Sequence, residues 1–228
     1  MSTANVFNEE GRLLQIEYAI KNVSKAGTII GVVCTNGIVL IGINKEDIPE
    51  NDGRREKIYP ITDKIYVALC GLFGDAMLLK KYAQIKAQDI LEKYDQEASL
   101  SCVVKEVSKK KQLFTQYAQT RPFGVSFIYA GMEDDEFLIY STDPSGTINQ
   151  WKGVAYGENE DGINKGLKDL LIKDMESTTL EIIKILSKVV ECGVKESKKF
   201  EILHYGDTEV KYLSHEEIKK ILEEIENK

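Results

Sequence analysis

The stretch TIIGVVCTNGIVLIGI, residues 28–43, contains two apolar runs joined by a turn signal. Asn36-Gly37 suits a tight hairpin, because both residues tolerate the positive φ angles that such a turn requires. The two runs, residues 28–34 and 38–43, are apolar at successive positions instead of alternating with polar ones. Strands of that kind are buried on both faces, so this hairpin predicts a sheet that is covered on both sides.

Downstream of the hairpin, short β-type runs are followed by pairs of longer helical runs. Strands are predicted at 57–61, 64–71, 125–130, 136–142, 148–156, 200–205 and 209–213, and helices at 72–94, 100–117, 161–173, 180–196 and after Ser214. Ser214 and Glu217 have the spacing of a capping box at the start of the last helix. This order favours two face-to-face sheets, each covered outside by a helix pair. The predicted fold is an α/β four-layer αββα sandwich.

A further helix is expected before the hairpin, over residues 12–25. Its apolar residues recur at steps of three and four and would share one face: Leu13, Ile16, Ile20 and Val23. Gly27 is placed to end this helix. The chain has 4 prolines and no Pro/Gly/Ser-rich linker, so residues 1–228 are predicted to form one domain.

The overall charge argues against two classes of partner. The chain has 30 lysines and arginines against 37 acidic residues, which gives a formal net charge of −7. Nucleic acids and anionic membranes bind clustered basic residues. The nearest such run, residues 105–111, contains Glu106 and lies in a predicted helix, so a solvated helix face is favoured over a binding patch. We therefore expect no nucleic-acid and no membrane partner.

The cysteines and histidines do not have the spacing of a metal site. Cys34, Cys70, Cys102 and Cys192 form no CxxC pair, and His204 and His215 stand in no ligand cluster. We expect reduced, buried cysteines in a cytosolic or nuclear protein, without a metal or another cofactor. The first ten residues have no apolar run, and no stretch has the roughly 20 apolar residues that span a bilayer, so neither a signal peptide nor a membrane-spanning helix is expected.

Short motifs along nearly the whole chain occur in one fixed order. They are Phe7, Glu10-Gly11-Arg12-Leu13, Gln15-Ile16-Glu17-Tyr18-Ala19, Gly27-Thr28, Asn36-Gly37-Ile38-Val39-Leu40, Glu56-Lys57-Ile58, Gly71-Leu72, Asp75-Ala76, Thr115-Gln116, Arg121-Pro122-Phe123-Gly124-Val125-Ser126, Asp143-Pro144-Ser145-Gly146 and Trp151-Lys152. In this order they resemble the α-type subunits of the 20S proteasome. The resemblance implies a sandwich of the N-terminal nucleophile hydrolase type with an added N-terminal helix. Within the family, residues 26–28, 56–59 and 121–131 are most similar to the alpha type-4 group, which occupies the third ring position.

The resemblance also bears on catalysis. Active β-type relatives use an N-terminal threonine as nucleophile, helped by an acidic residue and a lysine. Alignment on the hairpin puts Gly27 at the nucleophile's position, Ile43 at the acid's and Lys57 at the lysine's, and an isoleucine takes no proton. A cut before Thr28 would also remove the predicted N-terminal helix. We expect a non-catalytic subunit. The alternatives are a catalytic β-type threonine protease and a free-standing α/β enzyme.

The resemblance implies partners and a docking pocket. In the family, α subunits form a seven-membered ring above the β subunits and control entry in ubiquitin-dependent protein degradation, in cytoplasm and nucleus. Lys57 would line a pocket between adjacent α subunits that receives the C-terminal tails of activators or regulatory particles. Gly27, Leu72 and Glu17 would lie nearby or contribute to the next pocket. A tail carboxylate would gain a charge-assisted hydrogen bond there. Without the resemblance, the sequence favours a simpler interpretation, in which Lys57 ends a strand in solvent.

The segments before the sandwich, residues 28–228, would act at the pore. Residues 1–11 form the gate tail and residues 12–25 pack against neighbouring subunits. Phe7, Arg12 and Tyr18 are the expected gate and ring-contact residues. The alternatives are a surface position for Arg12 and simple packing for Tyr18.

The tail departs from the family pattern in one respect. The family carries Tyr-Asp-Arg in this tail and a proline just before Glu-Gly-Arg. Here Glu9 stands at the proline's position, and the family's Tyr-Asp would fall before or at Met1. We therefore expect a short tail that covers the pore poorly.

Overall fold

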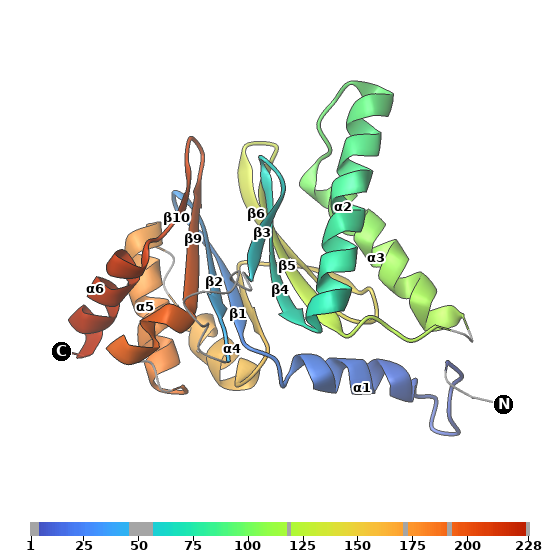
Figure 1. Cartoon of the computed structure of the whole chain (residues 1–228), viewed down its shortest axis with the longest axis horizontal. Helices are drawn as coiled ribbons and strands as arrows, with labels where there is room; N and C mark the ends of the chain where they lie inside the picture. The colour runs from blue at the N-terminus through green and yellow to red at the C-terminus, as the bar shows by residue number, and fades with distance from the viewer. Residues whose placement is uncertain (1–4, 46–56, 118–119, 171–172, 191–192, 227–228) are drawn as a thin grey trace.

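The computed structural model describes residues 5–45, 57–117, 120–170, 173–190 and 193–226, and the statements below concern these residues. Figure 1 shows two sheets side by side in the middle of the molecule, with helices on both outer sides. A separate helix at the N-terminal end lies across one end of the sheets.

Both sheets have five strands and are antiparallel in the pairs described. The first has the order β10-β9-β2-β1-β8 and the second the order β3-β4-β5-β6-β7. Their bounds are β1 Ile29–Cys34, β2 Gly37–Ile43, β3 Ile58–Thr62, β4 Ile65–Gly71, β5 Val125–Glu133, β6 Glu136–Thr142, β7 Ile148–Trp151, β8 Gly153–Tyr156, β9 Phe200–Gly206 and β10 Val210–Tyr212. The predicted hairpin is confirmed, with Cys34 opposite Gly37.

The hairpin is buried on both faces, as its unbroken apolar runs predict. Every residue of β2 is buried. Ile38 and Leu40 belong to the core between the two sheets, together with Ile128 of the second sheet. Val39 and Ile41 point the other way, into the core beneath the outer helices. Alternate residues of one strand therefore serve two separate cores.

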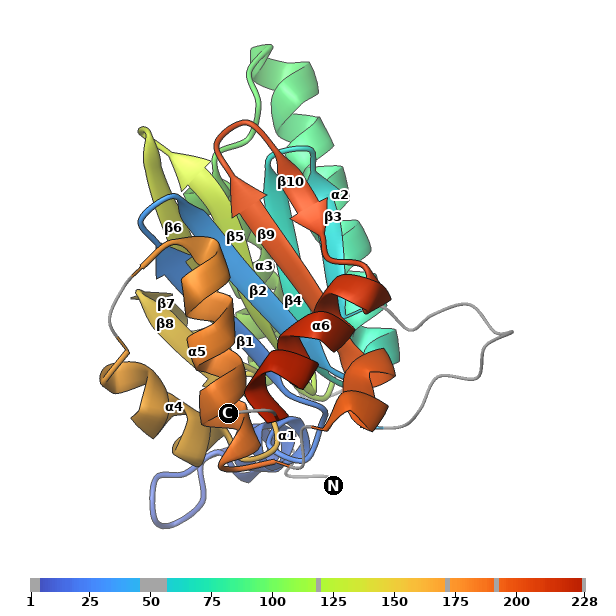
Figure 2. The ribbon, with the colours of Figure 1, turned by 90° about the vertical axis from the view of Figure 1, so that its left-hand side faces the viewer.

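Helices cover the outer face of each sheet. The second sheet carries α2 (Phe73–Tyr94) and α3 (Leu100–Gln116), and the first carries α4 (Glu160–Lys168) and α5 (Met175–Ser187). Figures 1 and 2 show these layers from two directions. The predicted four-layer αββα sandwich is confirmed. In the part of the chain that is described, α6 (His215–Glu226) joins α4 and α5, because its Ile218 and Leu222 enter the same core.

The strand expected over residues 148–156 is two strands in different sheets. β7 pairs with β6 of the second sheet, whereas β8 pairs with β1 of the first. The chain passes from one sheet to the other at Lys152, so the single-strand prediction was wrong. An extended, β-type run shows that the backbone is stretched, but it does not show with which neighbour the backbone pairs.

The two helices after β8 also differ from the prediction. The first ends at Lys168 rather than at residue 173. The second begins at Met175 rather than at residue 180, because Asp174 caps it and accepts a 2.9 Å hydrogen bond from the Ser177 backbone N–H. It ends at Ser187, and Val194–Lys199 form a short 3₁₀-helix instead of continuing it.

The capping box of the last helix is confirmed. The Ser214 backbone N–H donates to Glu217 Oε2 at 2.7 Å, and the Glu217 N–H donates to Ser214 Oγ at 3.3 Å. Both bonds satisfy donors that a helix start leaves open.

The basic run at residues 105–111 is not a uniformly solvated face. Lys105 and Lys109 are exposed, but Lys111 is fully buried beneath α3. Its ammonium donates hydrogen bonds to the Val125 and Thr142 carbonyl oxygens at 2.9 and 3.0 Å. The prediction was wrong at Lys111, because a helix with lysines at successive positions turns one of them toward the sheet.

The N-terminal helix, α1, is shorter than predicted and spans Leu14–Val23. Ala19 and Val23 are its buried residues, whereas Ile20 is exposed. The face of the helix that is buried is therefore rotated away from the predicted apolar face, which included Ile20. The helix ends at Val23, with Ser24 as its C-cap, rather than at Gly27, so Gly27 has another role, described below.

The thiols of Cys34 and Cys70 are buried, and that of Cys102 is half-buried; all three are free. Cys192 lies outside the described residues.

Candidate functional site

One end of the sandwich brings together two residues that the sequence analysis singled out. Lys57 stands just before β3 and Gly27 just before β1. The Lys57 Nζ donates a 2.5 Å hydrogen bond to the Gly27 carbonyl oxygen. A pocket of about 210 Å³ opens beside them, with Lys45, Gly71 and Phe73 among its other lining residues. The structure thus places the predicted lysine in a pocket rather than at a solvated strand end.

The Lys57 ammonium is partly removed from water. Burial lowers the pKa of Lys57 below its ordinary value, while Cys70 and Glu201 act in the opposite direction. The Cys70 thiol lies 3.4 Å from the same Gly27 carbonyl oxygen, and burial raises the pKa of Cys70 to about 12. Cys70 is therefore a protonated, unreactive neighbour. Among the described residues, the Lys57 ammonium bonds to the neutral Gly27 carbonyl oxygen. A carboxylate ligand would restore interactions that burial removed.

Gly27 is required by the close approach of its neighbours. A Cβ at this position would lie 2.3 Å from the Ile43 carbonyl oxygen and 3.1 Å from Lys57 Nζ. Any larger residue would push against the β2 backbone and the lysine. This contact explains the glycine that the sequence analysis assigned to a helix end.

The other two predicted pocket residues lie differently. Leu72 is exposed just before α2, and its backbone N–H donates to the Gly124 carbonyl oxygen at 2.9 Å. Its neighbours Gly71 and Phe73 line the pocket. Glu17 lies on α1, where its Oε1 accepts a 2.7 Å hydrogen bond from Arg12 Nε. Within one chain, therefore, Lys57 and Gly27 lie together while Glu17 pairs with Arg12.

The geometry around Thr28 bears on the possibility of catalysis. Thr28 is buried and its hydroxyl donates a 2.8 Å hydrogen bond to the Glu158 carbonyl oxygen. Ile43, at the position of the acidic partner, is buried with its N–H bonded to the Thr28 carbonyl oxygen at 2.8 Å. A threonine nucleophile needs an accessible hydroxyl and a base beside it. Here the hydroxyl is bonded to backbone, and Lys57 is bonded to Gly27.

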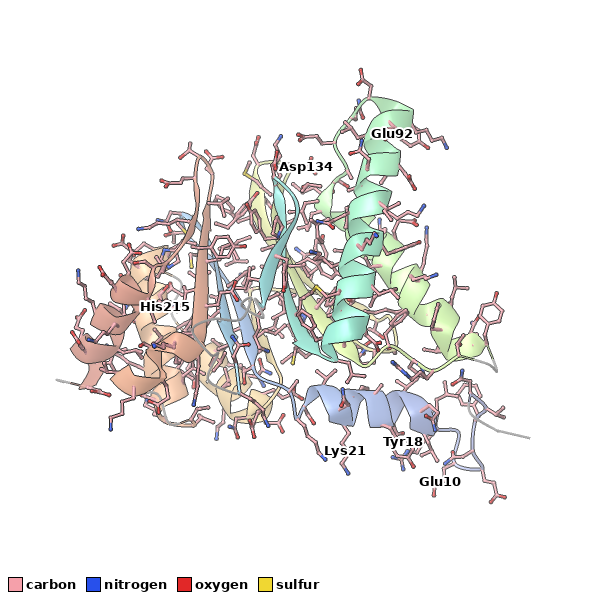
Figure 3. The ribbon with its side chains drawn as sticks, in the orientation of Figure 1. Glu10, Tyr18, Lys21, Glu92, Asp134 and His215 are labelled. Carbon is pink, nitrogen blue, oxygen red and sulfur yellow. The ribbon has the colours of Figure 1, made fainter. Side chains whose placement is uncertain are left out.

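The outer side of the N-terminal segment carries apolar and aromatic side chains. Phe7 is 67% exposed and Tyr18 57% exposed. In Figure 3, Tyr18 and Lys21 point from α1 away from the rest of the molecule. Arg12 is held between Glu10 and Glu17. The sequence-predicted ring-contact residues thus share one exposed segment.

The described part of the tail, from Asn5 to Gly11, is fastened to its own chain. The Asn5 side-chain amide donates to the Tyr117 and Thr120 carbonyl oxygens at 2.7 and 3.0 Å, just beyond the end of α3. Asn8 Oδ1 accepts a 2.8 Å hydrogen bond from the Arg12 backbone N–H and closes a turn. This anchor is not predictable from the sequence, because no local pattern marks a side chain that bonds to a segment more than a hundred residues away.

The Arg121-Pro122-Phe123-Gly124 motif is a structural element. Arg121 binds Asp75, near the start of α2, through both terminal nitrogens at 2.6 and 2.9 Å. Asp75 Oδ2 also accepts a 3.0 Å hydrogen bond from the Gly124 N–H. The motif thus ties the entrance of β5 to α2. Asp143 makes the predicted turn, since its Oδ1 accepts from the Ser145 and Thr147 N–H groups.

The described residues contain no group of three or more histidine, cysteine, aspartate or glutamate side chains that could hold a metal ion. No helix among them combines the length and the apolar character needed to cross a membrane.

Comparison with known proteins identifies the family. The family model described as "Proteasome subunit" matches residues 23–204. The probable proteasome subunit alpha type-3 of Encephalitozoon cuniculi is 56% identical over 228 residues, which cover 99% of this chain and 97% of that protein. The proteasome subunit alpha type-3 of Saccharomyces cerevisiae is 36% identical over 97% of this chain and 90% of its own length. The proteasome subunit alpha type-4 of Spinacia oleracea is 33% identical over 98% and 93%.

The first two of these relatives carry the type number 3 and the third carries the type number 4. All of them are α-type subunits, in agreement with the motifs of the N-terminal segment. The geometry and the matches together place this chain in the proteasome subunit family, as a member of its α type.

Proposed function

We propose that the chain is a non-catalytic ring subunit of a 20S proteasome, in which it serves assembly, gating and activator docking. The observation that carries this proposal is the state of Thr28. Its hydroxyl is buried and bonded to the Glu158 carbonyl oxygen, and Ile43 supplies no proton acceptor. N-terminal sequencing of the chain from assembled particles tests it: a start at Thr28 would overturn the proposal.

The outer face of α1 supports a role in ring assembly. Leu14 and Tyr18 lie one turn apart on this helix and are both exposed, and neighbouring apolar residues on a surface mark interfaces. In the proposed assembly, α1 (within residues 12–25) packs against adjacent α subunits of a seven-membered ring, with β subunits below. The sandwich of residues 28–228 forms the ring wall. The alpha type-4 resemblance favours the third ring position, and the cytoplasm and nucleus are the expected locations.

The Lys57 pocket supports a role in docking. A half-buried ammonium beside an open pocket suits the C-terminal carboxylate of an activator tail. Gly27 makes room for the lysine. Leu72 and Glu17 would contribute from the pocket rim or to the pocket of the next subunit.

The tail supports a limited role in closing the pore. Asn5 fastens the tail to the end of α3, so Phe7, Arg12 and Tyr18 would act as contacts near the pore rather than as a plug. Deletion of residues 2–6 should leave basal peptide hydrolysis by the particle nearly unchanged. A large rise in that rate would mean that this tail closes the gate.

Docking is tested with Lys57→Ala and Lys57→Arg in assembled particles. The alanine variant should lose stimulation by an activator-tail peptide, while basal hydrolysis remains. The arginine variant keeps the charge, but its planar guanidinium is larger than the ammonium that packs against Gly27. It should therefore recover only part of the stimulation. Full stimulation of the alanine variant would refute the docking role of Lys57.

A further inference from the structure

The side chain of Lys57 lies along a floor made by two glycines, Gly42 in β2 and Gly27 just before β1. A Cβ at Gly42, in β2, would lie 2.7 Å from Lys57 Cβ and 3.2 Å from its Cδ. A Cβ at Gly27 would lie 3.1 Å from both Lys57 Cε and Nζ. Gly42 thus makes room for the stem and Gly27 for the ammonium. A glycine inside an apolar strand marks such a close approach.

The backbone of Lys57 is held by the residue that pairs with Gly42. Glu201 of β9 stands opposite Gly42 in the register of the first sheet. Its Oε2 accepts a 2.6 Å hydrogen bond from the Lys57 backbone N–H. Gly42 and Glu201 are therefore paired across β2 and β9, and both contact Lys57. Gly42 lies against its side-chain stem, and Glu201 binds its backbone N–H.

Such an arrangement restrains a side chain that is otherwise very mobile. Lysine has one of the largest rotamer entropies among amino acids, and a ligand that binds it in solvent must overcome that entropy. The stem of Lys57 already lies in its channel before any ligand arrives. Among the residues that the structure describes, the groups with charge or titratable protons around it are Glu201 from β9, Cys70 from β4 and Lys45, which lines the same pocket.

We propose that Gly42 and Glu201 are positioning residues for Lys57, which hold its ammonium where a peptide C-terminal carboxylate can bind it. Gly42 sets the path of the stem. Glu201 fixes the backbone by accepting the Lys57 N–H, and its negative charge opposes the lowering of the Lys57 pKa by burial. This inference rests on the docking function proposed above and names residues that contact no ligand themselves.

The first experiment uses assembled particles that carry Gly42→Ala. The probe is a short synthetic activator-tail peptide with a free C-terminal carboxylate, compared with its amidated twin. Loss of a well-placed charge-assisted hydrogen bond reduces affinity about tenfold to a hundredfold, so the preference for the free carboxylate should fall by that factor. Gly153→Ala is the matched control, because a Cβ there meets its nearest neighbour at 3.6 Å, an ordinary contact.

The second experiment reports on Lys57 itself and needs only the purified chain. NMR titration of ¹³Cε-labelled lysine, assigned by the signal missing in Lys57→Arg, gives the pKa of Lys57. Gly42→Ala should raise this pKa toward its ordinary value, because the displaced ammonium becomes solvated. Glu201→Gln should lower it further, because it removes a negative charge and keeps a hydrogen-bond acceptor. A purely structural role would not move the pKa in opposite directions.

The outcomes separate this inference from the docking proposal. If Lys57→Ala still prefers the free carboxylate, the docking function fails. In a second outcome, Lys57→Ala loses that preference while Gly42→Ala keeps it to within about twofold of wild type, well short of the expected tenfold change. That result would refute the positioning role and leave the docking function standing. Unchanged Lys57 titration in both positioning variants would refute it as well.

Discussion

Replacement of the buried Lys111 by methionine should change how the stability of the chain depends on pH. Lys111 is fully buried between α3 and the second sheet. Its ammonium donates to two carbonyl oxygens and to the Thr142 hydroxyl, and lies 4.7 Å from the centre of the Phe127 ring. Burial lowers the pKa of Lys111 from 10.5 to about 7, against a smaller opposing effect of Asp143. Methionine has a similar length and no charge, so it removes the titration and keeps most of the packing.

The sign follows from proton binding in the two states. Above about pH 7 the folded chain releases the Lys111 proton, whereas the unfolded chain keeps it up to pH 10.5. The unfolded state then binds more protons, so the free energy of unfolding rises with pH in this window. Each pKa unit corresponds to about 1.4 kcal/mol, and the full shift to about 5 kcal/mol. Between about pH 7 and about pH 9, the contribution of Lys111 increases by about 2 kcal/mol.

Urea unfolding of the purified chain at several pH values measures this difference. The wild-type free energy of unfolding should gain about 2 kcal/mol relative to Lys111→Met over that range. The methionine variant also leaves its former acceptors without this donor, but that loss does not depend on pH and only offsets the two curves. Lys105→Met, on the exposed side of the same helix, is the control and should run parallel to wild type. Parallel curves for wild type and Lys111→Met would show that Lys111 is not buried as described.

Three further changes test other contacts. Asn5→Ala removes the donor that fastens the tail to the end of α3, so limited proteolysis should cut the tail faster; an unchanged rate would argue against the anchor. Asp75→Asn should lower the free energy of unfolding by about 1 kcal/mol or less, because Arg121 is largely exposed, and a double-mutant cycle with Arg121→Gln should show that the two losses are not additive. Ser214→Ala removes the cap of α6 and should cost about 1 kcal/mol, with faster amide hydrogen exchange confined to the first turn; exchange spread over the whole helix would contradict a local capping effect.

The sequence was sufficient for the layers of the fold, because the signals that specify them are local. The hairpin at Asn36-Gly37 and the cap at Ser214 depend on residues within a few positions of one another. The switch of sheets at Lys152 and the inward turn of Lys111 depend instead on what packs opposite them. Neither is visible in the period of a single segment.

The candidate site divides in the same way. Lys57 and Gly27 were found through the resemblance to proteasome α subunits. In the structure, the Lys57 Nζ lies 2.5 Å from the Gly27 carbonyl oxygen. Glu201 was missed, since its contact with Lys57 joins residues 144 positions apart. Gly42 is visible in the sequence as a glycine between two isoleucines in a predicted buried strand, a pattern that indicates a close approach by another group. The structure identifies that group as the side chain of Lys57.

Among the described residues, the half-buried Lys57 ammonium bonds to a backbone carbonyl and to no carboxylate. An ammonium removed from water needs compensation, and the Gly27 carbonyl supplies one neutral acceptor. Glu201, the nearby carboxylate, bonds to the backbone of Lys57. A carboxylate that arrives from another molecule would meet an ammonium already placed and already partly desolvated, so less of the binding free energy goes into ordering the lysine. In the proposed docking role, the same burial that makes Lys57 costly to the isolated chain would make it an effective ligand for a carboxylate.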